Sequence, residues 1–91
     1  MTTIVLTDLI KGKQAHIDSI GSNPEFGEWD AIVSRRLADL GFSPGMPLLV
    51  IATGLMGKGP YAVRLGNQSQ FSLRSGEAKK ILCRIVDGSK L

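Results

Sequence analysis

The stretch from Ala31 to Gly45, Ala-Ile-Val-Ser-Arg-Arg-Leu-Ala-Asp-Leu-Gly-Phe-Ser-Pro-Gly, predicts a helix, a sharp stop and a tight turn. Apolar residues recur in and just before it at three- and four-residue steps, which places them on one helical face. These residues are Trp29, Ile32, Val33, Leu37 and Leu40. We expect this face to pack on the core of the domain.

The end of this helix is the best-specified local structure in the chain. Gly41 follows the last apolar position, where a left-handed residue commonly ends a helix, and Phe42 is then placed to pack back on Leu37. The next four residues, Ser43 to Met46, suit a type II turn in which Gly45 supplies the positive φ. The chain should therefore enter the following strand with little freedom.

Short β-prone runs separated by turn residues make up most of the remaining chain. The runs lie at 13–20, 48–53, 61–65, 70–74 and 81–86. The run from Leu48 to Thr53 is almost wholly apolar, which predicts a strand that is buried on both faces or lies at the core of a barrel. A chain with so few residues can bury these strands and protect their edges most easily by forming a small, strongly bent barrel. We therefore predict a mainly β fold with one or two short helices, forming a small β-barrel.

Length and composition indicate an ordinary globular domain. The 91 residues, 43% hydrophobic and 21% charged, allow one domain over residues 1–91. The net charge of +3 is mild and would favour an acidic partner or the inner surface of a membrane. The chain has no basic leader and no apolar run near the roughly 20 residues that cross a bilayer. We therefore expect a cytoplasmic protein that does not insert in the membrane.

The residues available for chemistry are few. His16 and Asp18 share one face of a predicted strand and would bind a divalent transition metal only weakly, because specific sites need about four ligands. No cofactor is required by the sequence, and such surface pairs commonly bind nothing. The acidic residues Glu25, Glu28 and Asp30 are interpreted as a solvated helix start.

Catalysis has little raw material in this chain. Cys83 is the only cysteine and lies in an alternating strand, so we expect it to be packed rather than reactive. The glycine-rich loop from Gly54 to Gly59 lacks the spacing of a phosphate-binding loop. Its Leu55 and Met56 would instead be apolar contacts for a partner, or simply part of a hairpin loop. We predict that the protein is not an enzyme.

A family resemblance rests on the opening stretch. Arg35 to Gly45 resembles the RRL-x-x-LG-x-x-PG segment of the FeoA family, small accessory proteins of bacterial ferrous-iron uptake. The likeness extends to Leu6-Thr7-Asp8-Leu9 with Gly12, to Gly57 and Pro60, and to Leu73-Arg74 with Ala78-Lys79-Lys80-Ile81. The chain departs from the family in the longer segment from Gly21 to Asp30, which adds Phe26 and Trp29.

The resemblance implies a small SH3-like β-barrel and a non-catalytic role. A FeoA protein would dock on the cytoplasmic side of FeoB, a GTP-binding membrane transporter of ferrous iron, and modulate it. We predict that the docking surface joins the helix to the glycine-rich loop. Its residues would be Arg35, Arg36, Asp39, Leu55, Met56 and Lys58, although the helix residues also fit a merely solvated face.

Other functions stay open at this level. A metal-responsive regulatory module is one, because similar SH3-like domains are appended to DtxR-type repressors and act there through protein contacts. Binding of nucleic acid is not expected, because it would require a basic groove with exposed aromatic residues and the chain has five aromatic residues in total. The sequence leaves a homo-oligomer open.

Overall fold

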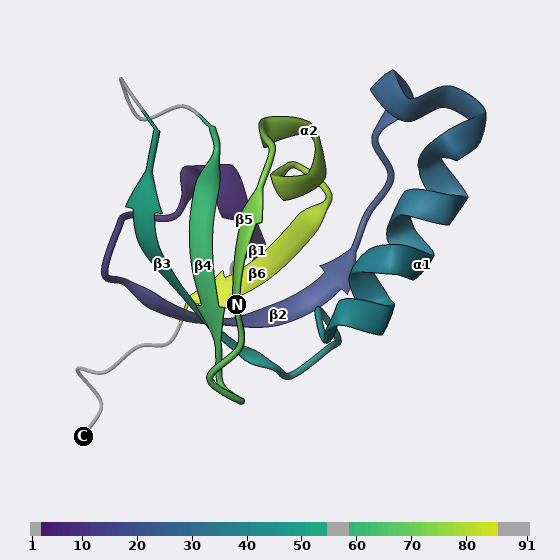
Figure 1. Ribbon diagram of the computed structural model, residues 1–91. Helices are drawn as coiled ribbons and strands as arrows, with labels where there is room; N and C mark the ends of the chain where they lie inside the picture. The colour runs from purple at the N-terminus through teal and green to yellow at the C-terminus, as the bar shows by residue number, and fades with distance from the viewer. Residues whose placement is uncertain (1–2, 55–58, 86–91) are drawn as a thin grey trace.

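The computed structural model describes residues 3–54 and 59–85, and six strands form one antiparallel sheet within them (Figure 1). The strands are β1 (Thr3–Val5), β2 (Gln14–Ile20), β3 (Pro47–Thr53), β4 (Tyr61–Leu65), β5 (Gln70–Leu73) and β6 (Ile81–Ile85). Two α-helices, α1 (Asp30–Leu40) and α2 (Ser75–Ala78), and two 3-10 helices, η1 (Leu6–Asp8) and η2 (Pro24–Trp29), complete these elements. The prediction of a mainly β fold is confirmed, with β1 as one strand more than expected.

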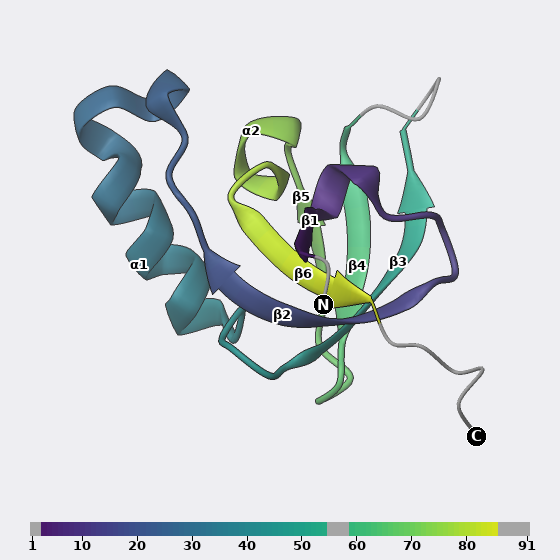
Figure 2. The ribbon, with the colours of Figure 1, turned by 180° about the vertical axis from the view of Figure 1, so that it is seen from behind.

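The sheet follows the order β1-β6-β2-β3-β4-β5 and curls around its own core (Figures 1 and 2). Register shifts between Ile17 and Ser19 in β2, and between Val50 and Ala52 in β3, bend the two central strands. Within the described residues, β1 and β5 remain the two edges, so hydrogen bonds do not close the predicted barrel completely.

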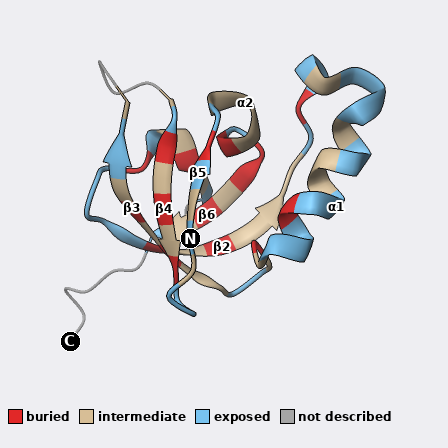
Figure 3. Cartoon of the chain, viewed as in Figure 1, coloured by how far each residue is buried: buried red, intermediate tan, exposed pale blue. Residues whose placement is uncertain are grey.

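The inner face of the curled sheet carries the apolar core, seen as red bands in Figure 3. Its fully or almost fully buried members are Leu6, Ala15, Ile17, Leu37, Phe42, Leu48, Val50, Val63, Leu65, Ala78, Ile81 and Cys83. Only one of these, Leu37, comes from helix α1. The core is therefore made almost entirely by the sheet and its connections.

Strand β3 follows the second of its two predicted placements, at the core of the barrel. Leu48 and Val50 are buried, whereas Leu49 and Ile51 are half-buried, so the strand has one buried face. An antiparallel sheet commonly packs one face on the core and leaves the other partly exposed.

The junction after α1 has the predicted geometry. Gly41 adopts a φ of 112°, and the backbone N–H of Phe42 donates to the carbonyl of Leu37 at 3.1 Å. Gly45 adopts a φ of 87°, and the N–H of Met46 closes the turn on the carbonyl of Ser43 at 3.0 Å. These two glycines accept backbone angles that other residues adopt only with strain.

The apolar face of α1 contradicts the prediction. Leu37 is buried and Val33 is half-buried, but Trp29, Ile32 and Leu40 expose 61%, 51% and 41% of their surface. The reason is the position of the helix, which lies beside the end of β2 instead of across the sheet (Figures 1 and 2). Only the side of α1 that carries Leu37 can then reach the core.

Candidate partner-binding surface

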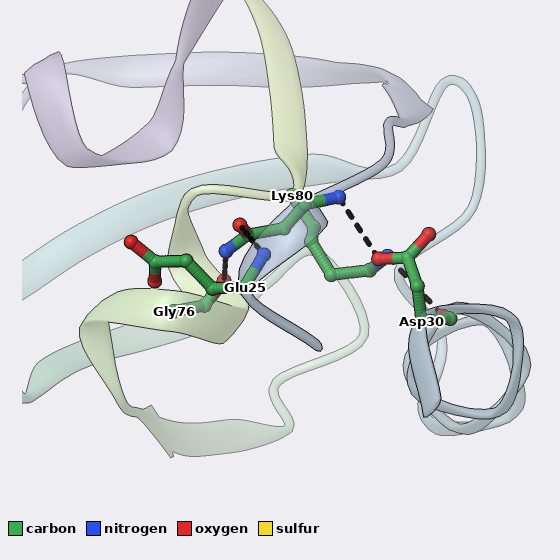
Figure 4. A network of polar contacts seen from close by, with 5 residues as sticks. Glu25, Asp30, Gly76 and Lys80 are labelled. Carbon is green, nitrogen blue, oxygen red and sulfur yellow. Dashed lines mark hydrogen bonds and ion pairs between the residues drawn. The ribbon is translucent and has the colours of Figure 1, made fainter. Parts of the chain in front are cut away.

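The helix α1 and the 3-10 helix η2 before it form an extension that we call the arm (residues 24–40). A partly buried ion pair holds the arm to the corner between α2 and β6 (Figure 4). The ammonium group of the fully buried Lys80 pairs with the carboxylate of Asp30, and its Nζ also donates to the Asp30 carbonyl at 3.3 Å. Asp30 is the first residue of α1, so this contact fixes the start of the helix.

Asn23 extends the same contact. Its backbone N–H donates to Asp30 Oδ1 at 2.8 Å, and its buried side-chain amide donates to the carbonyl of Gly76 in α2 at 3.0 Å. The Asn23 side-chain oxygen accepts from the N–H of Glu25 at 3.0 Å and so caps η2. We call Asn23, Asp30 and Lys80 the latch. It lowers the pKa of Asp30, first through the Lys80 hydrogen bond and then through the Asn23 N–H.

The latch corrects the interpretation of the acidic residues. Asp30 is part of a partly buried ion pair rather than a solvated helix start, whereas Glu25 forms an exposed ion pair with Lys79 at 3.7 Å and Glu28 is exposed. Helix α1 begins at Asp30 itself. The sequence carried only a weak signal for this contact, the unusual length of the segment from Gly21 to Asp30.

A cleft separates the arm from α2, and we call it the α1–α2 cleft. Its lining residues are Phe26, Arg36, Arg74, Gly76 and Glu77. Phe26 packs on Gly76, where even a Cβ atom would come within 3.3 Å of the ring, and the ring centroid lies 5.8 Å from Lys80 Nζ. Arg36 on α1 and Arg74 just before α2 are both exposed. The cleft therefore combines an aromatic contact with two guanidinium groups.

The exposed apolar residues of the arm lie on the Arg36 side of α1. Trp29, Ile32, Arg36 and Leu40 are spaced by three, four and four residues, which places them along one side of a helix. Arg36 lines the cleft, and Ile32 and Leu40, four residues before and after it, lie on the same side of the helix. This side of α1 therefore carries large exposed apolar groups with a positive charge among them.

The predicted docking residues do not all belong to this surface. Arg35, Arg36 and Asp39 are exposed. Successive residues of a helix are about 100° apart, so Arg35 projects to a different side from Arg36, whereas Asp39, seven residues after Ile32, lies close to the side that carries Ile32. Leu55, Met56 and Lys58 lie outside the described residues. The pairing of the helix with the glycine-rich loop stays a prediction.

The predicted metal ligands lie on β2 next to an arginine. Asp18 Oδ1 is 3.5 Å from Arg84 Nε, and Asp18 Oδ2 accepts from Ser19 Oγ at 3.1 Å. Arg84 also lies opposite His16 in the register of β2 and β6. Residues 3–54 and 59–85 contain no group of three or more His, Cys, Asp or Glu side chains that could hold a metal. Two ligands beside a guanidinium group do not build a specific site, and weak metal binding there stays a prediction.

Cys83 is packed, as predicted. Burial raises the pKa of its thiol to about 12, and the negative charge of Asp18 adds to that rise. The thiol is therefore protonated at neutral pH and is a poor nucleophile.

Comparison with known proteins identifies the fold and the family. The FeoA domain model matches residues 4–85. The structure of Stenotrophomonas maltophilia FeoA complexed with zinc, a prokaryotic SH3 domain protein, is 31% identical, with a TM-score of 0.73 and 88% of each chain covered. A FeoA-like protein from Clostridium acetobutylicum is 28% identical, with a TM-score of 0.74 over 96% of this chain and 92% of that one. The prediction of an SH3-like fold is thereby confirmed.

The same fold occurs inside larger proteins. A manganese-dependent transcriptional repressor in complex with manganese gives a TM-score of 0.76 at 20% identity, over 94% of this chain and 38% of the repressor. At this identity the likeness shows the fold alone.

A comparison with curated protein sequences found no match. None of the helices in the described residues is long and apolar enough to span a membrane. From the family model and the Stenotrophomonas structure together, the chain belongs to the FeoA family, the accessory proteins of ferrous-iron transport.

Proposed function

We propose that this protein acts in the cytoplasm by docking on the cytoplasmic side of a FeoB-type ferrous-iron transporter and modulating it, without catalysing a reaction itself. One observation carries this proposal beyond family membership: Trp29, Ile32 and Leu40 are exposed on an arm that a partly buried ion pair holds in place. The Stenotrophomonas relative has itself been discussed as a ferrous iron transport activating factor.

Exposed apolar side chains of this size point to a partner. A contiguous apolar surface bordered by polar groups is typical of protein interaction sites. Tryptophan and arginine are also the residues that most often dominate binding energy at interfaces, and this surface has Trp29 and Arg36 on one side of α1. The arm is fixed by Lys80 and Leu37, so the apolar face is presented in a defined position.

Association with the full-length transporter tests the proposal. The tagged protein is expressed with FeoB from the same genome, and the membranes are solubilised for co-purification. GTP hydrolysis by purified FeoB in nanodiscs is then measured with and without the protein. We expect a retained complex and a changed hydrolysis rate. A folded protein that neither co-purifies nor changes the rate would contradict the proposal.

The docking residues predicted from the sequence are tested in the same assays. Arg35→Glu and Met56→Asp address the helix and the glycine-rich loop, and Lys13→Glu is a control with the same charge change as Arg35→Glu. Lys13 is exposed in the connection from η1 to β2. If both folded variants bind as the parent does, the contact uses another part of the surface.

A further inference from the structure

The α1–α2 cleft has a positive charge that its own contacts do not neutralise. Lys80 is paired with Asp30, and Lys79 with Glu25. The carboxylate of Glu77 accepts the backbone N–H of Arg74 at 3.0 Å and so serves the start of α2. Among the residues that line the cleft, Arg36 and Arg74 contribute two positive charges against the single negative charge of Glu77.

The two guanidinium groups come from the two opposing walls. Arg36 belongs to α1, and Arg74 lies just before α2. Arg74 also lines a second hollow with Gly59, Pro60, Ser72 and Ser75, so the opening continues past it along the edge strand β5. A chain segment bound in the cleft would therefore have Arg36 on its arm side and Arg74 on its sheet side. Arginine binds carboxylates well in such positions because its planar fork donates two parallel hydrogen bonds.

Resting on the proposed function, we infer that this cleft receives an acidic amphipathic segment of the transporter. Carboxylates of the segment bind between Arg36 and Arg74, and its apolar side chains cover Trp29, Ile32 and Leu40. The charge of the cleft selects against basic segments, and the apolar border selects against segments that are polar throughout.

A second copy of this chain fits the cleft less well. Each copy carries a net charge of +3, so two positive clefts that approach one another repel. Nucleic acid is also disfavoured, because the carboxylate of Glu77 lines the cleft and phosphate tracking requires a longer basic groove. A separate acidic protein segment satisfies both the charge and the apolar surface.

Binding to full-length FeoB in nanodiscs tests the inference with variants on either wall. The affinity is measured with the protein labelled at its N-terminus, for the parent, Arg36→Glu, Arg74→Gln and Ile32→Ser. All three positions are exposed or border the cleft, and substitution leaves the core intact. Circular dichroism and the thermal midpoint confirm the fold of each variant. We expect each substitution to weaken binding by about tenfold or more, while Lys13→Glu stays within about twofold.

Salt provides an independent measurement. Raising the ionic strength screens a guanidinium–carboxylate contact, so the parent should lose more affinity than a variant that lacks both Arg36 and Arg74 charges. An equal salt response of the two proteins would overturn the assignment of the cleft.

Further outcomes separate the inference from the proposed function. If the parent binds FeoB and the cleft variants bind as Lys13→Glu does, FeoB docking stands and the cleft is the wrong site. If Arg35→Glu weakens binding and Arg36→Glu does not, the transporter contacts a different side of α1.

If the parent does not bind FeoB at all, both the proposed function and the inference are overturned. If a single-stranded oligonucleotide competes with FeoB for the protein, nucleic acid rather than an acidic protein segment is the occupant of the cleft.

Discussion

The curled sheet and the arm are held in place by different physical means. The sheet buries a continuous set of apolar side chains, from Leu6 to Cys83, on its inner face. The arm contributes one fully packed apolar anchor, Leu37, and depends at its other end on the latch between Asp30 and Lys80. The comparison indicates that apolar burial stabilises the domain as a whole, whereas a partly buried ion pair sets where the arm and its proposed docking surface lie.

The largest effect should follow from a core truncation in the sheet region. Phe42 is fully buried and its ring packs on Phe71 with centroids 5.4 Å apart, so Phe42→Ala removes a large apolar group and leaves a cavity. We expect a loss of about 3–5 kcal/mol in the free energy of unfolding, measured by urea denaturation. Ile32→Ala, on the exposed side of α1, is the matched control and should change little. Comparable losses for the two variants would contradict the division between core and arm.

A smaller but more localised loss should follow from breaking the latch. Asp30→Asn leaves the ammonium of Lys80 buried beside a neutral amide, which penalises the closed position of the arm. We expect a lower thermal midpoint than the parent and faster amide hydrogen exchange in 24–36 than in the strands. Glu28→Gln removes an exposed charge two residues away and serves as the control. Uniform acceleration of exchange over the whole chain would argue against a local role.

The latch should also make stability depend on acid pH. The pKa of Asp30 is lowered below its ordinary value of 3.8 in the folded protein, so the unfolded chain takes up the proton first as the pH falls. The stabilisation is therefore complete above about pH 5 and is lost progressively below it. The parent should lose more stability than Asp30→Asn between about pH 5 and pH 2, as followed by urea midpoints at each pH. If the urea midpoints of the two proteins fell in parallel with pH, Asp30 would not be the cause of the loss of stability in acid.

The smallest effect is expected at the junction between the two regions. Gly41 has a φ of 112° and its position for a Cβ atom lies 3.3 Å from Leu65 Cδ1, so Gly41→Ala introduces backbone strain and a tight contact. We expect a loss of about 1 kcal/mol by urea denaturation, with the fold retained. Gly12→Ala is a useful comparison, because Gly12 also has a positive φ but open space around it. A neutral Gly41→Ala would show that the helix end tolerates other geometries.

The sequence predicted those parts of the fold that depend on neighbouring residues. The helix stop at Gly41 and the turn at Gly45 follow from backbone requirements of single positions, and both were found as predicted. The alternation of Tyr61, Val63 and Leu65 likewise identified β4. Each of these signals lies within a few residues of the structure it specifies.

The candidate site depended on information that local patterns do not contain. Asp30 and Lys80 are separated by 50 residues, and the residues around either position do not indicate that the two are in contact. The periodicity that placed Trp29 and Ile32 on one face was correct, but a period does not say whether that face meets the core or the solvent. Arg36 was predicted as a partner contact, whereas Arg74, Phe26 and the cleft required the tertiary arrangement.

Attachment at both ends of α1 has a kinetic consequence for recognition. The latch holds the first residue of the helix, and the contacts of Leu37 and Phe42 hold its last turn. A helix restrained at two points presents its exposed face already organised, so an incoming partner orders few additional dihedral angles. Encounter should then be governed by diffusion and the attraction between opposite charges rather than by a folding step. In the proposed complex, the buried Lys80 would thus influence the rate of association without contacting the partner.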